Sequence, residues 1–343
     1  MTSQRRNTIL FSLLSLGLIT LFFINISLGS ISIPFKEIYS SLTGGQASKS
    51  TWEYIIINYR LPKAITAVLV GMGLSTSGLL MQTLFRNPLA GPDVLGLSSG
   101  ASLGVAFVIL SAGLLPPFLS TLLLSPYGVV LASTLGSTVV LLLVLLISQR
   151  LRDTMAILIV GLMFGSFTSA IVGVLTYFSS AEQLQKFTFW SLGNLGNLSW
   201  TSIQILCVCV TIGLFLSVFS IKSLNALLLG ENYARSLGLN FKRARLIIIL
   251  ATSILAGSIT AFAGPIAFVG LAVPHIAKLI FKTSDHSVLY WSTLFLGASI
   301  MLICDAISQM PGMEITLPIN AITSIFGAPI VIWLLVRKRK MIG

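Results

Sequence analysis

Basic side chains gather in one interior segment of the chain, between two long apolar runs. Residues 222–245 contain a single acid, Glu231, and five cations, which are Lys222, Arg235, Lys242, Arg243 and Arg245. Lysine and arginine on a surface pair with carboxylates of another protein, and such pairs steer docking. The stretch from Asn225 to Leu237 has helical spacing and ends at Gly238, a residue type that commonly terminates helices. The pattern predicts a structured basic surface that another protein grips.

Residues arranged for catalysis are much harder to find. The sequence contains neither the GxxxxGK[ST] loop that cradles phosphates nor the HExxH zinc motif. Its three cysteines, Cys207, Cys209 and Cys304, lie inside apolar runs at a spacing that fits no metal site. We interpret them as small buried hydrophobic residues. We therefore expect the chain not to be an enzyme and to hold no metal or cofactor of its own.

The elements that carry the basic segment are apolar to an unusual degree. Of the 343 residues, 55% are hydrophobic and only 9% are charged, and the mean hydropathy is +0.98. This composition excludes a soluble domain and predicts a polytopic membrane protein. The formal net charge of +12 does not indicate nucleic-acid binding, because the charges stand at the ends of apolar runs and do not form one face.

Ten apolar segments have roughly the 20 residues that a helix needs to cross a bilayer. They lie near 9–28, 61–83, 94–113, 128–148, 155–178, 200–220, 246–263, 266–283, 288–308 and 319–336, and the third and eighth are the shortest. The first is too long for the core of a signal peptide, so we expect a retained span. Lipid offers backbone groups no partner, so every span is helical. We predict an all-α polytopic fold, with residues 1–343 as one transmembrane domain.

The charges between the spans predict an orientation. If the N-terminus is cytosolic, only five of the 21 Lys and Arg residues fall outside, namely Lys36, Lys49, Arg60, Lys63 and Lys186. The other 16 then face the cytosol, as the positive-inside rule requires. We therefore expect both termini and the basic segment 222–245 in the cytosol. The longest outside segment, 29–60, contains a Ser/Gly/Thr-rich stretch that predicts a surface loop.

Small residues recur at four-residue spacing on two spans, where they allow close helix packing. The stripe on the third span is Gly96, Gly100 and Gly104, and the stripe on the fifth is Gly161, Gly165, Ser169 and Gly173. Packing within the chain is the simpler interpretation, and a translocation path or a dimer face is the alternative. The fifth span is the stronger candidate for a path, because its stripe is longer and continues into Thr176.

Two similar strings hint at internal symmetry. GPDVLGL, residues 91–97, opens the third span on the inside, and GPIAFVGL, residues 264–271, opens the eighth on the outside. Spans two to five and seven to ten would then form inverted repeats, an arrangement common among transporters.

Four segments, in the same order, resemble one known family. They are RLPKAITAVLVGMGLSTSGLLMQTLFRNPLAGPDVLGLSSGASLG, ALLLGENYARSLGLN, GPIAFVGLAVPHIAKLIF and LPINAITSIFGAPIVIWLLVRKR, and they look like the permease subunits of type II bacterial ABC importers for iron–siderophore complexes, haem and cobalamin. The resemblance implies a homodimer of ten-helix subunits in the cytoplasmic (inner) membrane. It also implies two separate ATPase subunits that bind ATP and Mg²⁺, and a periplasmic or lipid-anchored substrate-binding protein.

The same resemblance gives the basic segment a role, because in the family this loop forms two short helices that dock into a cleft on the ATPase. Carried over, the coupling surface is Leu229, Gly230, Glu231, Ala234, Arg235, Ser236, Leu237 and Gly238. The alternative is a merely solvated basic loop.

Resemblance also implies contacts at the outer face and along a path. Arg60 and Lys63 match a basic pair that meets carboxylates of the binding protein, with lipid-headgroup anchoring as the alternative. Gln309 stands where many relatives have Arg, which departs from that docking pattern. Thr154 aligns with the cytosolic gate. Residues 182–195, with Phe187 and Trp190, match the short outer helix that gates the far side, although such aromatics could equally be interfacial anchors.

Two rival functions stay open on the residues alone. An ion- or proton-coupled secondary transporter needs ionisable groups deep in the membrane, and the candidates are Asp305 toward the outer end of its span and Asp93 at a cytosolic mouth. A membrane scaffold without transport would have no use for small-residue stripes and a docking surface together. We expect the membrane subunit of an ABC importer that moves a large metal chelate inward.

Overall fold

The computed structural model describes residues 3–29, 31–45, 48–114, 116–150, 154–196, 198–236, 238–309 and 316–339. Throughout these residues the regular structure is helical. Seven helices are long and apolar enough to cross a membrane, and the three shorter apolar helices are Leu97–Leu110, Val269–Phe281 and Ile319–Trp333. All ten coincide with the predicted spans, and the third and eighth spans are indeed short. An all-α polytopic fold is therefore confirmed.

The ten apolar helices have the following bounds. They are α1 (Ser3–Ser27), α4 (Leu61–Leu84), α5 (Leu97–Leu110), α7 (Pro126–Arg150), α8 (Thr154–Tyr177), α10 (Trp200–Val218), α13 (Phe241–Ala263), α14 (Val269–Phe281), α15 (His286–Ser308) and α16 (Ile319–Arg339). The span carrying α4 starts earlier than predicted, because α3 (Ser50–Ile55) and a π-helical turn (Ile56–Arg60) continue into it. The third span starts later, because a 3₁₀ turn, η2 (Pro92–Leu95), precedes it.

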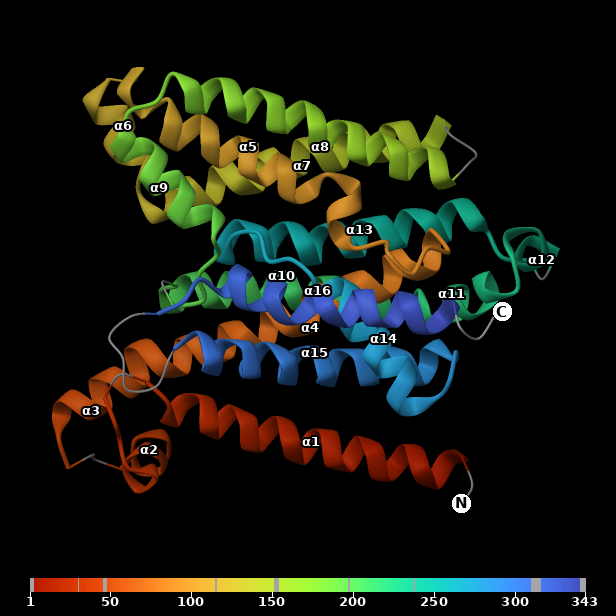
Figure 1. The fold of residues 1–343 in the computed structure, drawn as a ribbon, viewed down its shortest axis with the longest axis horizontal. Coiled ribbons are helices and arrows are strands. Elements are labelled where there is room, and N and C mark those ends of the chain that lie inside the picture. Colours follow the sequence, from red (N-terminus) through yellow and green to blue (C-terminus); the bar gives the residue numbers. More distant parts are fainter. Residues whose placement is uncertain are drawn as a thin grey trace.

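Short connecting helices gather at the two ends of the bundle. The helices α2 (Phe35–Leu42), α3, α6 (Pro117–Leu123) and α9 (Ala181–Ser191) lie at one end. The chain start, the end of α16, α11 (Ile221–Leu228) and α12 (Glu231–Ser236) lie at the other, as Figure 1 shows. The segment 29–60 contains α2 and α3, and the described residues of the Ser/Gly/Thr-rich stretch between them, 43–45 and 48–49, lie outside any helix.

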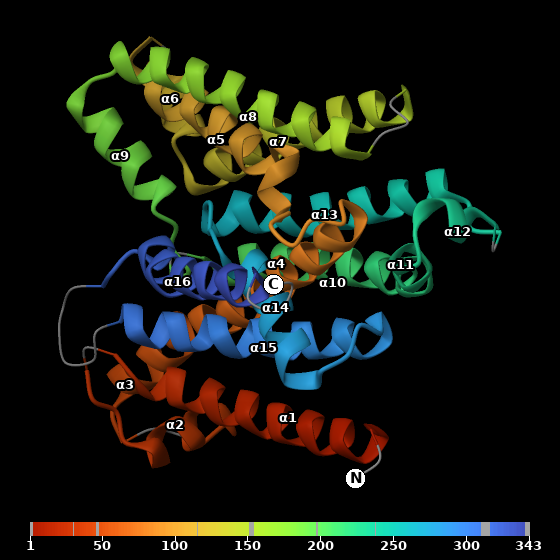
Figure 2. The same ribbon diagram turned by 45° about the vertical axis from the view of Figure 1, so that its right-hand side comes forward.

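The main apolar core surrounds α4, α13 and α15, the spans with the largest buried shares. A second, smaller cluster of Val105, Ala106, Ile109 and Leu110 lies on α5 and packs against α8 and α9. Figure 2 shows α5 to α9 on one flank of the molecule and α1 to α3 on the opposite flank. Cys304 is buried in the main core, whereas Cys207 is exposed on α10, so the prediction that all three cysteines are buried was wrong.

Close helix contacts depend on glycine, as helix association in lipid requires. A Cβ at Gly78 of α4 would overlap the backbone of Gly270 on α14, and one at Gly71 would overlap Gly297 on α15. The predicted stripe on α5 also serves packing, because Gly100 and Gly104 lie against the backbone of α7. Intramolecular packing is therefore the role of that stripe.

The two halves of the chain have the same order of helix lengths. In α4, α5, α7 and α8 the second helix is short, and the same holds for α13, α14, α15 and α16. Equivalent pairs also touch: α4 packs on α14 and α15, and α13 packs on α5 and α7. In each half a Gly-Pro pair precedes the short helix, with the 3₁₀ turn η2 following Gly91 in the first half and a non-helical stretch containing Gly264 and Pro265 in the second. These features match the inverted repeat that the sequence suggested.

Candidate coupling surface and translocation path

The helix α11 is held firmly against the spans. Leu224 and Leu227 are buried, and α11 contacts α4 and α15. The helix α12 follows after Gly230, whose φ of +111° is a backbone conformation that glycine adopts readily. Asn240 then caps the start of α13 by accepting a hydrogen bond from the Arg243 N–H at 3.1 Å. The predicted helical pair exists and is tied to the bundle.

Asn225 joins this pair to α15, a contact that the sequence analysis did not anticipate. Its Nδ2 donates to Asp285 Oδ1 at 2.8 Å, and its Oδ1 accepts from the His286 N–H at 2.7 Å. His286 Nε2 lies 2.8 Å from Thr83 Oγ1 on α4. The N–H of Ser287 and the amide of Asn225 hold the pKa of Asp285 below its usual value. The helix α11 is therefore joined directly to the start of α15, and His286 continues this contact to α4.

The outward face of the helical pair exposes large apolar side chains together with the basic side chain of Arg235. Leu228, Leu229 and Tyr233 are exposed large hydrophobic residues. Among the residues predicted for coupling, Arg235, Ser236 and Gly238 are also exposed, and Gly230 is half-buried. The side chain of Glu231 and the whole of Leu237 lie outside the described residues. We define the docking face as Leu228, Leu229, Tyr233, Arg235 and Ser236.

One residue predicted for the coupling surface, Ala234, and one cation of the basic segment, Arg245, are buried. Ala234 is 0% exposed, so it packs inside the pair and is not available to touch a partner. Arg245 is also buried, and its guanidinium lies 5.8 Å from the centre of the Phe241 ring. Arg235 lies over the same ring at 5.5 Å. Both arginines thus stiffen the start of α13 by cation–π contact.

At the opposite end, Arg60 does not face outward as expected. Its side chain is 8% exposed, and Nη1 donates to the carbonyls of Ile26 at 2.9 Å and Ser27 at 2.8 Å. Nη2 donates to the carbonyl of Ile31. Carbonyls at a helix C-terminus lack intrahelical partners, and a guanidinium satisfies several at once. The prediction that Arg60 is an exposed docking cation is therefore wrong, because its buried side chain binds the carbonyls at the end of α1.

Lys63 is likewise engaged within the chain. Its Nζ lies 3.1 Å from Asp305 Oδ1, and Asp305 is only 1% exposed. The other oxygen, Oδ2, accepts from Asn25 Nδ2 at 2.9 Å and from Gln309 Nε2 at 2.8 Å. Gln309 thus has a structural role at the position where relatives often carry Arg. Asp305 is a paired, fully surrounded carboxylate, which removes the main support for a proton relay.

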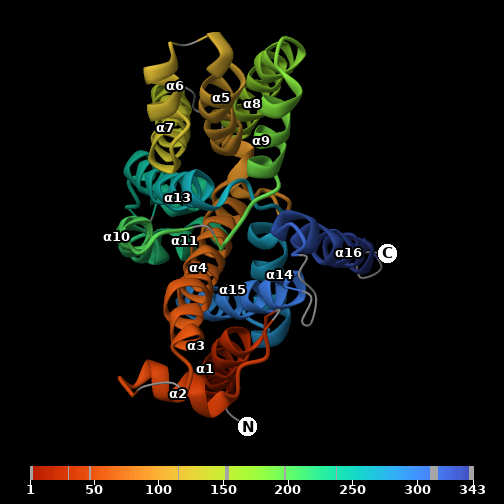
Figure 3. The same cartoon turned by 90° about the vertical axis from the view of Figure 1, so that its left-hand side faces the viewer.

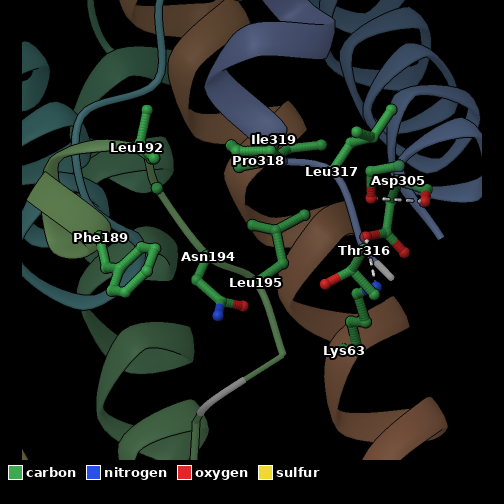
Figure 4. Close-up of a pocket in the computed structure, with 12 residues that line it drawn as sticks. Lys63, Phe189, Leu192, Asn194, Leu195, Asp305, Thr316, Leu317, Pro318 and Ile319 are labelled. Atoms are coloured by element: carbon green, nitrogen blue, oxygen red, sulfur yellow. Dashed lines mark hydrogen bonds and ion pairs between the residues drawn. The ribbon is translucent and has the colours of Figure 1, made fainter. Parts of the chain in front are cut away.

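Lys63 still reaches a cavity at this end of the bundle. The cavity has a volume of about 400 Å³ and lies between α9 with its following loop and the segment leading into α16. Figure 4 shows Phe189, Asn194 and Leu195 on one side and Lys63 with Asp305 on the other. The Asn194 N–H donates to the carbonyl of Ala263 at 2.9 Å, so this loop is bound to the end of α13.

The predicted path stripe on α8 divides into two parts. Gly161 and Gly165 face α5, where they lie close to Gly96 and Ser99. Ser169 and Gly173 are exposed, and nothing lies within 4 Å of a Cβ added at Gly173. The first part therefore packs within the chain, while the second remains open. Thr154 is the first residue of α8, and its side chain lies outside the described residues.

A polar cavity of about 420 Å³ adjoins the open part of α8. It is lined by Asp93, by the hydroxyl residues Ser98, Ser99, Ser102, Thr168 and Ser169, by Val172, by Pro265 to Ala267, and by Asn320. Pro92 and the carbonyl of Leu74 both lie against Gly270. Leu74 is near the middle of α4, so Asp93 lies deep in the bundle and not at a cytosolic mouth as predicted.

The aromatic residues of α9 do not reach this cavity. Phe187 and Trp190 stack on each other, with ring centres 6.1 Å apart, and pack against the α5 cluster around Val105 and Ile109. The short outer helix that contains them exists as predicted. Its position is fixed by packing on α5 and by the hydrogen bond from the Asn320 N–H to the carbonyl of Leu192.

Comparison with known proteins agrees with this architecture. The model of the FecCD transport family matches residues 17–337. The hemin transport system permease HmuU of Yersinia pestis is 34% identical over 92% of this chain and 91% of its own length. The vitamin B12 import system permease BtuC of Escherichia coli O9:H4 is 34% identical over 84% of this chain and 85% of its own.

A solved structure shares the whole fold. It is described as an inward-facing conformation of a metal-chelate type ABC transporter, and it superposes with a TM-score of 0.82 at 28% identity. The match covers 96% of this chain and 99% of that one. The family match over nearly the entire chain and the shared fold lead to one conclusion. This chain is a multi-pass membrane permease of the FecCD transport family of ABC importers.

Proposed function

We propose that this chain is the permease subunit that moves an iron(III)–siderophore, haem or cobalamin from a binding protein into the cytoplasm, powered by two separate ATPase subunits. The family match and the haem and vitamin B12 permeases among its relatives support this substrate class. The chain itself performs no catalysis in this proposal, and ATP and Mg²⁺ are bound by the ATPase subunits.

The docking face is the proposed contact with the ATPase. It exposes apolar side chains and the basic Arg235, and α11 is held to α4 and α15 through Leu224, Leu227 and Asn225. A rigid surface of this kind transmits the closure of an ATPase to the spans. We place this end of the bundle, with both termini, in the cytosol, because most of the basic residues gather there.

A second copy of the chain is the proposed partner within the membrane. Figure 3 shows α8, α9 and α16 along one side of the molecule, with α7, α10 and α13 on the other. Exposed apolar residues form a stripe on α8, at Ile159, Met163 and Phe167, and α16 exposes Ile332 and Trp333. We propose that these faces meet across a two-fold axis and enclose the path that Ser169 and Gly173 line, with Thr154 at its cytosolic end.

The binding protein is proposed to dock at the opposite end. Lys63 and the cavity beside Phe189 are the accessible features there, whereas Arg60 supports the surface from below. The helix α9, with Phe187 and Trp190, borders this end and is placed to close the path when the binding protein leaves.

The main structural support for the proposed function is the docking face anchored on α11. Two leucine substitutions, one on this face and one at the other end of the molecule, test it. Leu229 is 61% exposed on the docking face, and Leu122 is 58% exposed on α6 at the other end. An interface leucine contributes on the order of 1 to 2 kcal/mol to binding. Leu229→Ala should therefore weaken ATPase association about tenfold and lower ATP-driven uptake into proteoliposomes. Leu122→Ala should change neither.

The same proteoliposomes test the rival function. Uptake driven by a proton gradient without ATPase subunits would indicate a secondary transporter. The ion pair of Asp305 with Lys63 argues against that result, because it gives this carboxylate a structural role between α15 and α4.

A further inference from the structure

Asp93 differs from the other carboxylate deep in this bundle. Asp305 is almost fully buried and meets Lys63, Asn25 and Gln309. Asp93 is exposed and lines the polar cavity, and its Oδ1 accepts a hydrogen bond from the Ser98 hydroxyl. Within the described part of the chain, no Lys or Arg forms an ion pair with Asp93, in contrast to the Lys63–Asp305 pair.

Because Asp93 lies deep in the bundle, its exposure carries a large free-energy penalty unless the cavity contains water. Pro92, the neighbour of Asp93, and the carbonyl of Leu74 both lie against Gly270. Leu74 is separated from the end of α4 at Leu84 by roughly 15 Å of helix. Ionisable groups at such depth are placed toward water-filled cavities or polar partners and not toward lipid. The side of the molecule that carries Asp93 must therefore enclose water or a polar guest.

The other cavity walls suit a guest that donates hydrogen bonds. Thr168 Oγ1 donates to the carbonyls of Phe164 and Gly165, at 2.9 and 3.0 Å, which leaves its lone pairs as acceptors. The hydroxyls of Ser99, Ser102 and Ser169 can rotate to accept as well. Asn320 Oδ1 accepts from the Ala267 N–H at 3.0 Å and so fixes the wall on the α16 side. The site thus has an anionic centre with adaptable hydroxyl groups around it.

We propose that this cavity is a polar station on the translocation path, where Asp93 receives positive charge or hydrogen-bond donors of the transported chelate. It favours cationic or donor-rich metal chelates over anionic ones of similar size. This inference rests on the proposed transport function, but its electrostatic part can be measured without transport.

The first test reads the charge of the cavity with small thiol reagents. In a background with Cys207, Cys209 and Cys304 changed to Ser, Ser169→Cys is modified by a cationic and an anionic methanethiosulfonate, each of ethyl length. Asp93→Asn should lower the ratio of the cationic to the anionic rate about tenfold. Asp93→Glu should retain the ratio, and Leu122→Cys at the far end should be insensitive to Asp93→Asn. An unchanged ratio, or no modification at Ser169→Cys by either reagent, overturns the proposal.

The second test reads selectivity in the complete transporter. ATP-driven uptake of a cationic ferric hydroxamate and an anionic ferric catecholate is compared in the wild-type complex and in Asp93→Asn. The variant should raise uptake of the anionic chelate relative to the cationic one several-fold. If the wild-type complex takes up chelate and Asp93→Asn keeps the same preference between the two chelates, the polar station is overturned and the proposed function is not. If the wild-type chain binds no ATPase, the proposed function itself is contradicted.

Discussion

At the scale of single residues, several charged and amide side chains inside the bundle are engaged by other groups of the chain. Lys63 and Asp305 join α4 to α15, with Asn25 of α1 as a further partner. Arg60 fixes the end of α1 in a similar way. These side chains would carry large penalties if they were left without partners in an apolar surrounding. Their first role is therefore to hold spans together.

Removal of one partner of the buried ion pair should destabilise the protein. Asp305→Ala leaves the Lys63 ammonium uncompensated, and Lys63 is 19% exposed, so we expect a loss of about 2 to 4 kcal/mol in the free energy of unfolding. Thermal unfolding of the purified protein in detergent measures this. Lys63→Met in the Asp305→Ala background should recover part of the loss, and strict additivity of the two changes would contradict the pairing.

The attachment of α11 should depend on pH through Asp285. Because the folded pKa of this carboxyl is lowered, its contribution is present above the ordinary Asp pKa of about 3.9 and is lost as pH falls through the folded value. The hydrogen-exchange protection factors of the α11 amides should thus fall below about pH 4. Asp285→Asn should remove this pH dependence. A variant that keeps the wild-type profile would show that another group is responsible.

At the scale of elements, glycine sets how closely the spans approach. Gly78→Ala places a Cβ against the backbone of Gly270, where neither helix can yield locally, and should destabilise the protein by about 1 to 3 kcal/mol. Gly17→Ala on α1 is the matched control, because nothing lies within 4 Å of the added Cβ. Thermal unfolding in detergent compares the two. Equal midpoints for both variants would contradict the close approach of α4 and α14.

The elements could be predicted from the sequence, but the directions of their side chains could not. Span number follows from apolar length, and the helical pair at 222–245 follows from its spacing and caps. Lys63 gave no sign that its partner, Asp305, stands on a helix far along the chain. The sequence does not show that Ala234 faces the inside of the helical pair. It also does not show that carbonyls of α1 hold the Arg60 side chain inward. Such contacts depend on tertiary packing, which a single sequence does not display.

At the scale of the whole molecule, the two ends of the bundle present different surfaces. One end presents the docking face beside both chain ends, and the other presents the cavity at Lys63 beneath α9. The polar cavity around Asp93 lies between them. This polarity along the membrane normal suits a protein that receives cargo at one surface and force at the other.

The measurement that tests this account most directly is photo-crosslinking from the centre of the docking face. Tyr233 is 56% exposed there and is replaced by a photoreactive phenylalanine analogue in cells that express the complete transporter. The account predicts a crosslink from position 233 to an ATPase subunit. A crosslink from this position to the substrate-binding protein on the outer surface, or to lipid alone, would contradict it.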